Sequence, residues 1–294
     1  MPVSITLDRH WPSVGAGNRE RRSPVILPRS SSPAGSPSAF TATLRSPVVR
    51  VQAQIVLTLS VGALKPLLAN KDVRCPSLMQ VPEFAAKELG LRGLNLPSGL
   101  LAGRAAQDLD KIRDLADKAG APCLVLIEET PLAFGDQKLD TRNQLEERIR
   151  RLAAAANRLG CRDIAVRCAA KNTDEEFERV AGGLKAALQE VDRFDLNVLL
   201  LPHEGLTFEP ARLTDLIKKV GGFRIGSLPS FAHAHATGDV EKTLRKLAPY
   251  AESIDATIVG FKGETHQPFD LAACVESVRA VGYVNTLALD YVGK

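Results

Sequence analysis

The sequence predicts a (β/α)8 barrel, the TIM-barrel class, on three observations. Eight short apolar runs follow one another from Gln54 towards the C-terminus, and amphipathic stretches separate most of them. The spacing of the runs, roughly 30 residues, suits one strand and one helix per repeat. The runs are continuously apolar rather than alternating, which is typical of strands buried on both faces of a parallel sheet. An open doubly wound sheet is the alternative, but the chain has no GxGxxG or P-loop motif to favour it.

The expected strands are residues 54–59, 91–96, 122–128, 162–168, 196–202, 223–228, 255–261 and 284–290. The expected helices are residues 108–120, 141–160, 173–191, 208–220, 239–249 and 268–281. Gly120 and Gly160 stand where helices end, and Thr141 and Thr173 stand where helices begin. The chain ends at Lys294, shortly after the last strand. We therefore expect a barrel that lacks a full eighth helix.

Residues 1–50 differ in composition from the rest of the chain. They hold seven Arg and no Lys, and they are rich in Pro and Ser. Such a segment buries too little apolar surface to offset its ordering entropy, so we expect a disordered extension before a barrel domain at 51–294. Three interpretations stay open: an extension without function, an organellar targeting segment, or a flexible interaction arm.

Charge and cysteine content limit the function classes. The net charge of +4 arises in the extension, so the barrel domain is close to neutral and gives no reason to expect nucleic acid or an anionic membrane as partner. No apolar run reaches the eighteen residues of a membrane span. The five cysteines show no CxxC spacing, which favours buried, reduced thiols and a cytoplasmic setting.

Polar residues gather where the predicted strands end, and a TIM barrel carries its chemistry at the C-terminal ends of its strands. Four of the five histidines fall in these positions. The candidates are Glu128, Arg167, His203, Glu204, His233, His235, Lys262 and Asp290. Purely structural roles stay open for several of them: Glu128 or Glu204 capping a helix, His203 bonding a neighbouring strand end, Arg167 in an ion pair. His266 is expected in a solvated loop.

Three stretches carry a resemblance to a known family: "NVLLLPHEGLTFEPARLTDLIKKVG", "RIGSLPSFAHAHATGDVEKTLRKLAPYAESI" and "PFDLAACVESVRAVGYVNTLALDYVG". They resemble the fifth, sixth and closing segments of the sugar phosphate isomerase/epimerase family, the xylose isomerase-like TIM barrels. The resemblance covers roughly residues 54–294.

The resemblance implies a divalent metal (Zn, Mn or Mg) held by acids from strands 5, 6 and 8 and a histidine near strand 7. Asp290 matches the closing acid, but Leu201 and Ser230 stand where the other two acids belong. Glu204 and His235 are the expected substitutes, because zinc accepts three protein ligands and a water. If they fail, the site holds no metal.

The same resemblance assigns the remaining roles. Glu204, Asp290 and Lys262 are expected to be catalytic, and His203, Arg167, Glu128 and His233 to bind substrate. The implied reaction is metal-assisted proton transfer next to the carbonyl of a small carbohydrate or sugar phosphate.

Two other functions stay open. One is a degenerate barrel that binds a polyol or a protein without turnover. The other, a metal-dependent endonuclease, is disfavoured by the near-neutral core. Apolar residues 55–57 and 287–289 would lie bare beneath the missing helix. Neighbouring helices leaning inward, part of the N-terminal arm (residues 24–28) or a second subunit could cover them, and we expect a homodimer.

Overall fold

The computed structural model describes residues 54–75 and 77–293. The expected extension, residues 1–50, lies outside the described residues, so its disorder and its three interpretations stay predictions. The barrel unit, Val51–Lys294, is described by itself.

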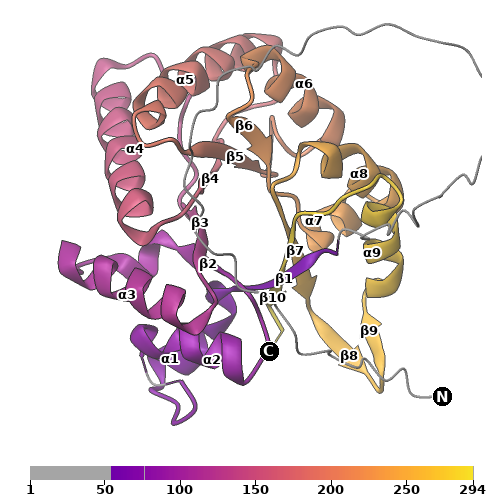
Figure 1. Ribbon diagram of the computed structural model, residues 1–294. Helices are drawn as coiled ribbons and strands as arrows, with labels where there is room; N and C mark the ends of the chain where they lie inside the picture. Colours follow the sequence, from indigo (N-terminus) through magenta and orange to yellow (C-terminus); the bar gives the residue numbers. More distant parts are fainter. Residues whose placement is uncertain (1–53, 76, 294) are drawn as a thin grey trace, which may run out of the picture. The chain divides into compact units, whose positions relative to one another are not determined.

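The barrel sheet consists of eight parallel strands in the order β6-β5-β4-β3-β2-β1-β10-β7 (Figure 1). Its strands are β1 Val56–Ser60, β2 Leu94–Pro97, β3 Cys123–Ile127, β4 Asp163–Arg167, β5 Asn197–Leu201, β6 Ile225–Ser227, β7 Ser253–Ile258 and β10 Thr286–Tyr291. Sequence neighbours are sheet neighbours throughout, without the reversal of a doubly wound sheet. The edge strands β6 and β7 meet through isolated parallel bridges, Ser227 with Ala251 and Ser230 with Asp255. The predicted TIM-barrel fold is confirmed.

Helices cover the outside of this sheet (Figure 1). They are α1 Lys65–Ala69, α2 Val81–Lys87, α3 Ala106–Ala119, α4 Leu139–Leu159, α5 Asp174–Asp192, α6 Pro210–Val220, α7 Phe231–Ala236, α8 Val240–Leu247 and α9 Leu271–Arg279, with 3-10 turns η1 Val61–Leu64, η2 Leu78–Gln80, η3 Ser98–Leu101 and η4 Ala248–Tyr250. Gly120 and Gly160 end α3 and α4 in the left-handed region, as predicted. The Thr173 hydroxyl accepts the backbone N–H of Glu176 and caps α5, but Thr141 caps nothing, because α4 begins two residues earlier. Within the described part no helix follows β10, and none is long and apolar enough to cross a bilayer.

The predicted seventh strand, 255–261, extends too far. β7 ends at Ile258, and the chain then forms a separate antiparallel hairpin of β8 (Gly260–Lys262) and β9 (Thr265–Gln267). Gly263, at φ +64°, supplies the left-handed turn residue between them. Lys262 therefore lies in a projecting hairpin and not at the end of a barrel strand.

The expected bare seam between the last and first strands is only half present. Leu287 is buried against Cys274 and Val278 of α9, which leans over this part of the sheet. Val56 and Leu57 of β1 are exposed by 42% and 45%.

Two adjacent glycines of α5, Gly182 and Gly183, report on how closely this helix packs against the β3–α4 loop. A Cβ on Gly183 would lie 2.1 Å from the carbonyl oxygen of Phe134, in the β3–α4 loop, whereas a Cβ on Gly182 would meet nothing within 4 Å. In both positions alanine gains about 1 kcal/mol of helix propensity. At Gly183 the added methyl group would overpack against the backbone, at a cost of roughly 1–3 kcal/mol that opposes this gain.

We therefore predict that Gly182→Ala raises the free energy of unfolding and that Gly183→Ala lowers it. Chemical denaturation followed by circular dichroism measures both. Equal effects of the two substitutions would show that α5 does not pack against the β3–α4 loop in this way.

Candidate functional site

The interior of the barrel is polar on the side of β7, β10, β1 and β2. Along β7, Ser253, Asp255 and Thr257 alternate with residues that pack against the helices. The Asn95 side-chain amide of β2 donates to the Ser253 hydroxyl at 3.1 Å, so these side chains meet inside the barrel. Thr58 Oγ1, Asn95 Oδ1 and Asp255 Oδ1 are buried without a hydrogen-bond partner among the described residues.

Four polar side chains form what we call the mouth cluster: Ser60, Arg167, Asp255 and Asp290, from β1, β4, β7 and β10. Asp255 pairs in register with Ala288, so it lies one layer deeper than Asp290. Burial, and then repulsion by Asp290, raises the pKa of Asp255 to about 8, although the nearby Arg167 charge acts in the opposite direction. Burial also raises the pKa of the Asp290 carboxyl, while a hydrogen bond from Ser60 and the Arg167 charge oppose the rise. The pair therefore holds one proton at neutral pH, on the deeper carboxyl.

The other half of the interior is apolar. Val125, Ile127, Ala165, Leu199, Leu201 and Leu228 form one buried cluster inside β3 to β6, which we call the apolar wall. Leu201 belongs to it, at the position where the family resemblance implies a metal-binding acid. This half of the mouth therefore offers no carboxylate.

Glu128 has a structural role. Its carboxylate is 2% exposed and accepts the Arg148 guanidinium (Nε to Oε2 2.6 Å), the Thr130 N–H (2.9 Å) and the Ser98 hydroxyl (3.4 Å). This bonding ties the end of β3 to α4 and η3 and uses both oxygens. The expected role of Glu128 in substrate binding stays a prediction.

Arg167 joins that structural group to the mouth cluster. Its Nη1 donates to the carbonyl oxygens of Glu128 (3.3 Å) and Glu129 (3.5 Å). These bonds hold the guanidinium at the mouth, where its charge acts on both aspartates. The predicted position of Arg167 at the site is thus present in the structure.

The two expected substrate-binding histidines stabilise loops. The His203 N–H donates to the Thr207 hydroxyl at 3.1 Å and so shapes the turn after β5. His233 Nε2 bonds the Phe208 carbonyl oxygen at 2.7 Å, and its ring meets the Phe208 ring edge-on. Burial lowers the pKa of His233, which keeps the ring neutral. Neither contact involves the mouth cluster.

Glu204, His235 and Lys262 are exposed, on the β5–α6 loop, on α7 and on the hairpin. The structure does not assemble Glu204 and His235 with Asp290: the described residues contain no group of three or more His, Cys, Asp or Glu placed to hold a metal ion. His266, expected to be solvated, is buried. Both of its ring nitrogens bond backbone within the hairpin.

Sequence reasoning missed Asp255 and Ser60. The signal for Asp255 was the alternation in "SIDATI", 253–258, where every second residue is polar. A strand with that pattern directs its polar face to one side, here the barrel interior.

A family model described as "Xylose isomerase-like TIM barrel" matches residues 84–289. The chain belongs to this family. No curated protein matches its sequence.

Several solved structures share the xylose isomerase-like fold. YcjR from E. coli, a 3-keto-D-glucoside 4-epimerase, is 16% identical with a TM-score of 0.63, covering 81% of this chain and 92% of its own. A sugar phosphate isomerase/epimerase from Parabacteroides distasonis is 14% identical with a TM-score of 0.62, covering 81% and 90%. The IolI protein, solved with a bound zinc atom, is 12% identical with a TM-score of 0.63, covering 80% and 88%. At these identities the likeness establishes the fold.

A divalent metal does not suit the donors of this chain. Leu201 and Ser230 supply no carboxylate, and the remaining acids, Asp255 and Asp290, face the cation Arg167. The residues at the mouth fit proton binding better than metal binding.

The raised pKa of Asp255 predicts how stability depends on pH. Its pKa is about 4 in an unfolded chain and about 8 in the fold. The folded state therefore holds a proton that the unfolded state has lost, and stability falls as pH rises between these values, by up to about 1.4 kcal/mol per pH unit. Asp255→Asn, which mimics the protonated carboxyl, should flatten this dependence.

The informative window is about pH 7 to 8. Burial raises the pKa of Asp163 to about 6, so its effect on stability lies at lower pH. The lowered pKa of His233 affects stability around and below the ordinary histidine pKa, where it makes stability rise with pH. Chemical denaturation of both proteins across this window measures the difference, and parallel curves would refute the protonated state of Asp255.

Proposed function

We propose that this barrel catalyses proton transfer next to the carbonyl of a small carbohydrate, as an isomerase or epimerase that uses carboxyl groups without a metal. The observation that carries the proposal is the mouth cluster. It places a half-buried carboxylate beside a guanidinium and above a protonated carboxyl, at the end of the barrel where this fold performs chemistry.

In the proposed reaction Asp290 is the base. Burial raises the pKa of Asp290, which makes it more basic than an ordinary aspartate, and the nearby Arg167 charge favours its ionised form. It removes the proton from the carbon next to the substrate carbonyl, and negative charge passes to the carbonyl oxygen. Arg167 stabilises that charge. For isomerisation the proton then returns to the former carbonyl carbon, while the hydroxyl proton of the deprotonated carbon moves to the former carbonyl oxygen. For epimerisation a water donates a proton to the same carbon from the opposite face, and the hydroxide left behind takes up the proton held by Asp290.

Asp255 has a positioning role. Because it carries the proton of the pair, it adds no negative charge beneath Asp290 and leaves that carboxylate free to ionise. The expected catalytic residues Glu204 and Lys262 receive no role here, since both are exposed outside the mouth cluster.

The family and the fold neighbours support the substrate class. The printed names of the neighbours include a 3-keto-D-glucoside 4-epimerase and an L-ribulose 3-epimerase. The barrel that binds without turnover is the competing function. An enzyme would exchange a carbon-bound proton of the bound sugar with water, whereas a barrel that only binds would not.

The test is isotope exchange in D2O, followed by proton NMR, with a panel of aldoses, ketoses and their phosphates. We predict that the full chain exchanges the proton next to the carbonyl of at least one member, with EDTA present. Asp290→Asn should slow exchange by at least about 100-fold. Asp255→Asn should stay within a few-fold of the wild type at neutral pH.

Asp195→Asn is the matched control, because Asp195 is exposed, lies outside the mouth and has a left-handed backbone that suits Asn. It should exchange at the wild-type rate. Sugar binding without any exchange would overturn the proposal in favour of the non-catalytic barrel. If EDTA abolishes the exchange and added Zn or Mn recovers it, the reaction depends on a metal and the metal hypothesis holds.

We also infer a homodimer, from the exposed apolar side chains Val56, Leu57 and Val284 beside the β1–β10 pairing. Leu57→Lys should then convert a dimer to a monomer in sedimentation experiments at micromolar concentration. A wild-type monomer under these conditions would contradict the inference. The five cysteines are all buried and free, which supports the expected cytoplasmic setting.

A further inference from the structure

A second cavity, of about 460 Å³, lies against the β8–β9 hairpin. Its lining includes two phenylalanines and five polar residues: Phe261, Phe269, Glu264, Thr265, His266, Gln267 and Asp270. None of these residues belongs to the mouth cluster. The hairpin nevertheless begins just after β7, and its root is tied to the end of β10, where the Val292 N–H donates to the Ile258 carbonyl oxygen at 2.9 Å.

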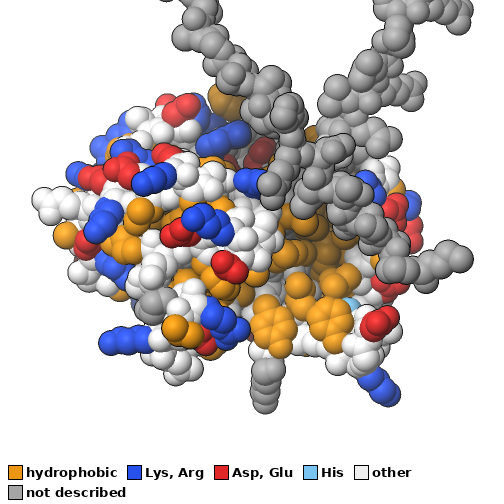
Figure 2. Space-filling model, turned by 60° about the horizontal axis from the view of Figure 1, so that its bottom comes forward, with side chains coloured by type: hydrophobic (Ala, Val, Ile, Leu, Met, Phe, Trp, Pro, Cys, Tyr) orange, Lys and Arg blue, Asp and Glu red, His pale blue; other side chains and the backbone are white. Residues whose placement is uncertain are grey.

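The Phe261 ring is an exposed platform with a fixed base. It is 58% exposed, and its inner edge meets the His266 ring at 5.5 Å between centroids. His266 Nε2 accepts the Val259 N–H at 3.0 Å, so its Nδ1 carries the proton and donates to the Phe269 carbonyl oxygen at 2.7 Å. Figure 2, which brings the lower part of Figure 1 forward, shows hydrophobic side chains gathered on this face. The platform is therefore held in place before any ligand arrives.

The polar rim supplies hydrogen-bonding groups that the fold leaves available. Thr265 and Gln267 are exposed, and neither Glu264 nor Asp270 has a basic partner among the described residues. Asp270 uses Oδ1 to cap α9 through the Ala272 N–H at 2.8 Å, which fixes the carboxylate at the edge of the cavity. The rim carries negative charge only.

We propose that this cavity is a second carbohydrate subsite, for one neutral sugar ring. The C–H face of a pyranose is apolar and stacks on an aromatic ring, while its hydroxyls require acceptors and donors around the edge. Phe261 supplies the aromatic ring, and the carboxylates, Gln267 and Thr265 supply the hydrogen-bonding groups. The uncompensated acids repel phosphate, so the ring bound here carries none.

Together with the proposed function, on which this step rests, the subsite narrows the substrate. A sugar whose carbonyl end reacts at Asp290 would place a second unit over the hairpin. The substrate class is then a neutral glycoside of two or more units, not a free sugar phosphate.

The test is binding of cellobiose, maltose and lactose to the full chain by saturation-transfer NMR and calorimetry, with glucose and glucose 6-phosphate as comparisons. We expect at least one disaccharide to bind more tightly than glucose, and glucose 6-phosphate to bind more weakly. Phe261→Ala should weaken disaccharide binding about three- to tenfold, the range of a lost ring contact.

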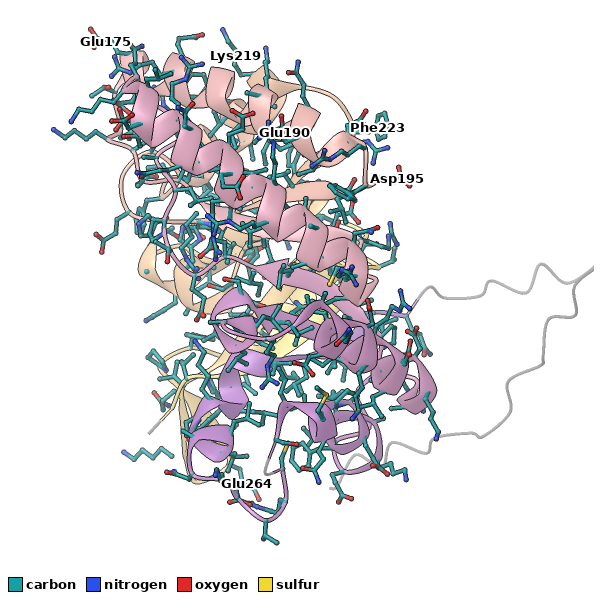
Figure 3. All side chains as sticks on the ribbon, turned by 90° about the vertical axis from the view of Figure 1, so that its left-hand side faces the viewer. Glu175, Glu190, Asp195, Lys219, Phe223 and Glu264 are labelled. Atoms are coloured by element: carbon teal, nitrogen blue, oxygen red, sulfur yellow. The ribbon has the colours of Figure 1, made fainter. Side chains whose placement is uncertain are left out.

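Phe223→Ala is the matched control, because Phe223 is 87% exposed and lies at the opposite end of the barrel from Glu264 (Figure 3). It should bind disaccharides like the wild type. Equal disaccharide affinity in Phe261→Ala and the wild type would overturn the subsite. It would also be overturned if choline, added as a further test compound, bound in a Phe261-dependent way while no saccharide bound.

The two proposals fail separately. Isotope exchange with no advantage of disaccharides over glucose would remove the subsite and leave the proposed reaction. Disaccharide binding that depends on Phe261, with no exchange in any sugar, would remove the reaction and leave the subsite.

Discussion

The burial of two aspartates inside one half of the barrel is the constraint on which the rest of the site depends. Asp255 and Asp290 project from adjacent strands into an interior whose other half is filled by leucine, isoleucine, valine and alanine side chains. Two charges in that space would repel each other and lose hydration, so one carboxyl keeps its proton and the other is balanced by Arg167. The backbone carbonyls of Glu128 and Glu129 in turn hold Arg167, and the buried Glu128–Arg148 ion pair fixes their loop.

The fold was predictable because it rests on repeated local signals. Eight buried apolar runs and six amphipathic segments each appear in the structure, with boundaries that shift by a few residues. Glycine at the ends of α3 and α4 and threonine at the start of α5 act as their chemistry suggests. The β8–β9 hairpin was missed because its six paired residues continue the composition of β7, and only Gly263 marks the turn. Leu287 shares a buried cluster with Cys274 and Val278 of α9, which fits the inward-leaning helix that the sequence left open. The sequence could not choose this alternative, because the lean of a helix is set by packing and not by its own sequence.

The site was predicted only in part. Asp290 and Arg167 do lie at the mouth, as expected from strand ends. Asp255 was overlooked because the predicted strand, 255–261, began at this residue, at the end away from the expected site, whereas β7 begins at Ser253. His233 and Glu128 are close to the expected places, but their side chains bond a loop and a helix, and sequence position alone cannot give the direction of a side chain. His203 bonds the turn after β5 through its backbone.

Under the proposed function, the metal site implied by the family is replaced by two carboxyl groups and a guanidinium. Loss of the acids on β5 and β6 leaves an apolar wall, and an aspartate on β7 brings a second carboxyl next to Asp290. A cation is still present, but it is the guanidinium of Arg167. The same barrel thus keeps a means of stabilising negative charge on a substrate oxygen while changing its chemical nature.

The protonation state of Asp255 is the central claim, and a carboxyl titration tests it most directly. In protein labelled with 13C at the aspartate side-chain carboxyl, the account predicts one resonance that titrates near pH 8. That resonance should be absent from the spectrum of Asp255→Asn. A wild-type spectrum in which no aspartate titrates above about pH 7 would contradict the account, because both carboxyls at the mouth would then be charged at neutral pH.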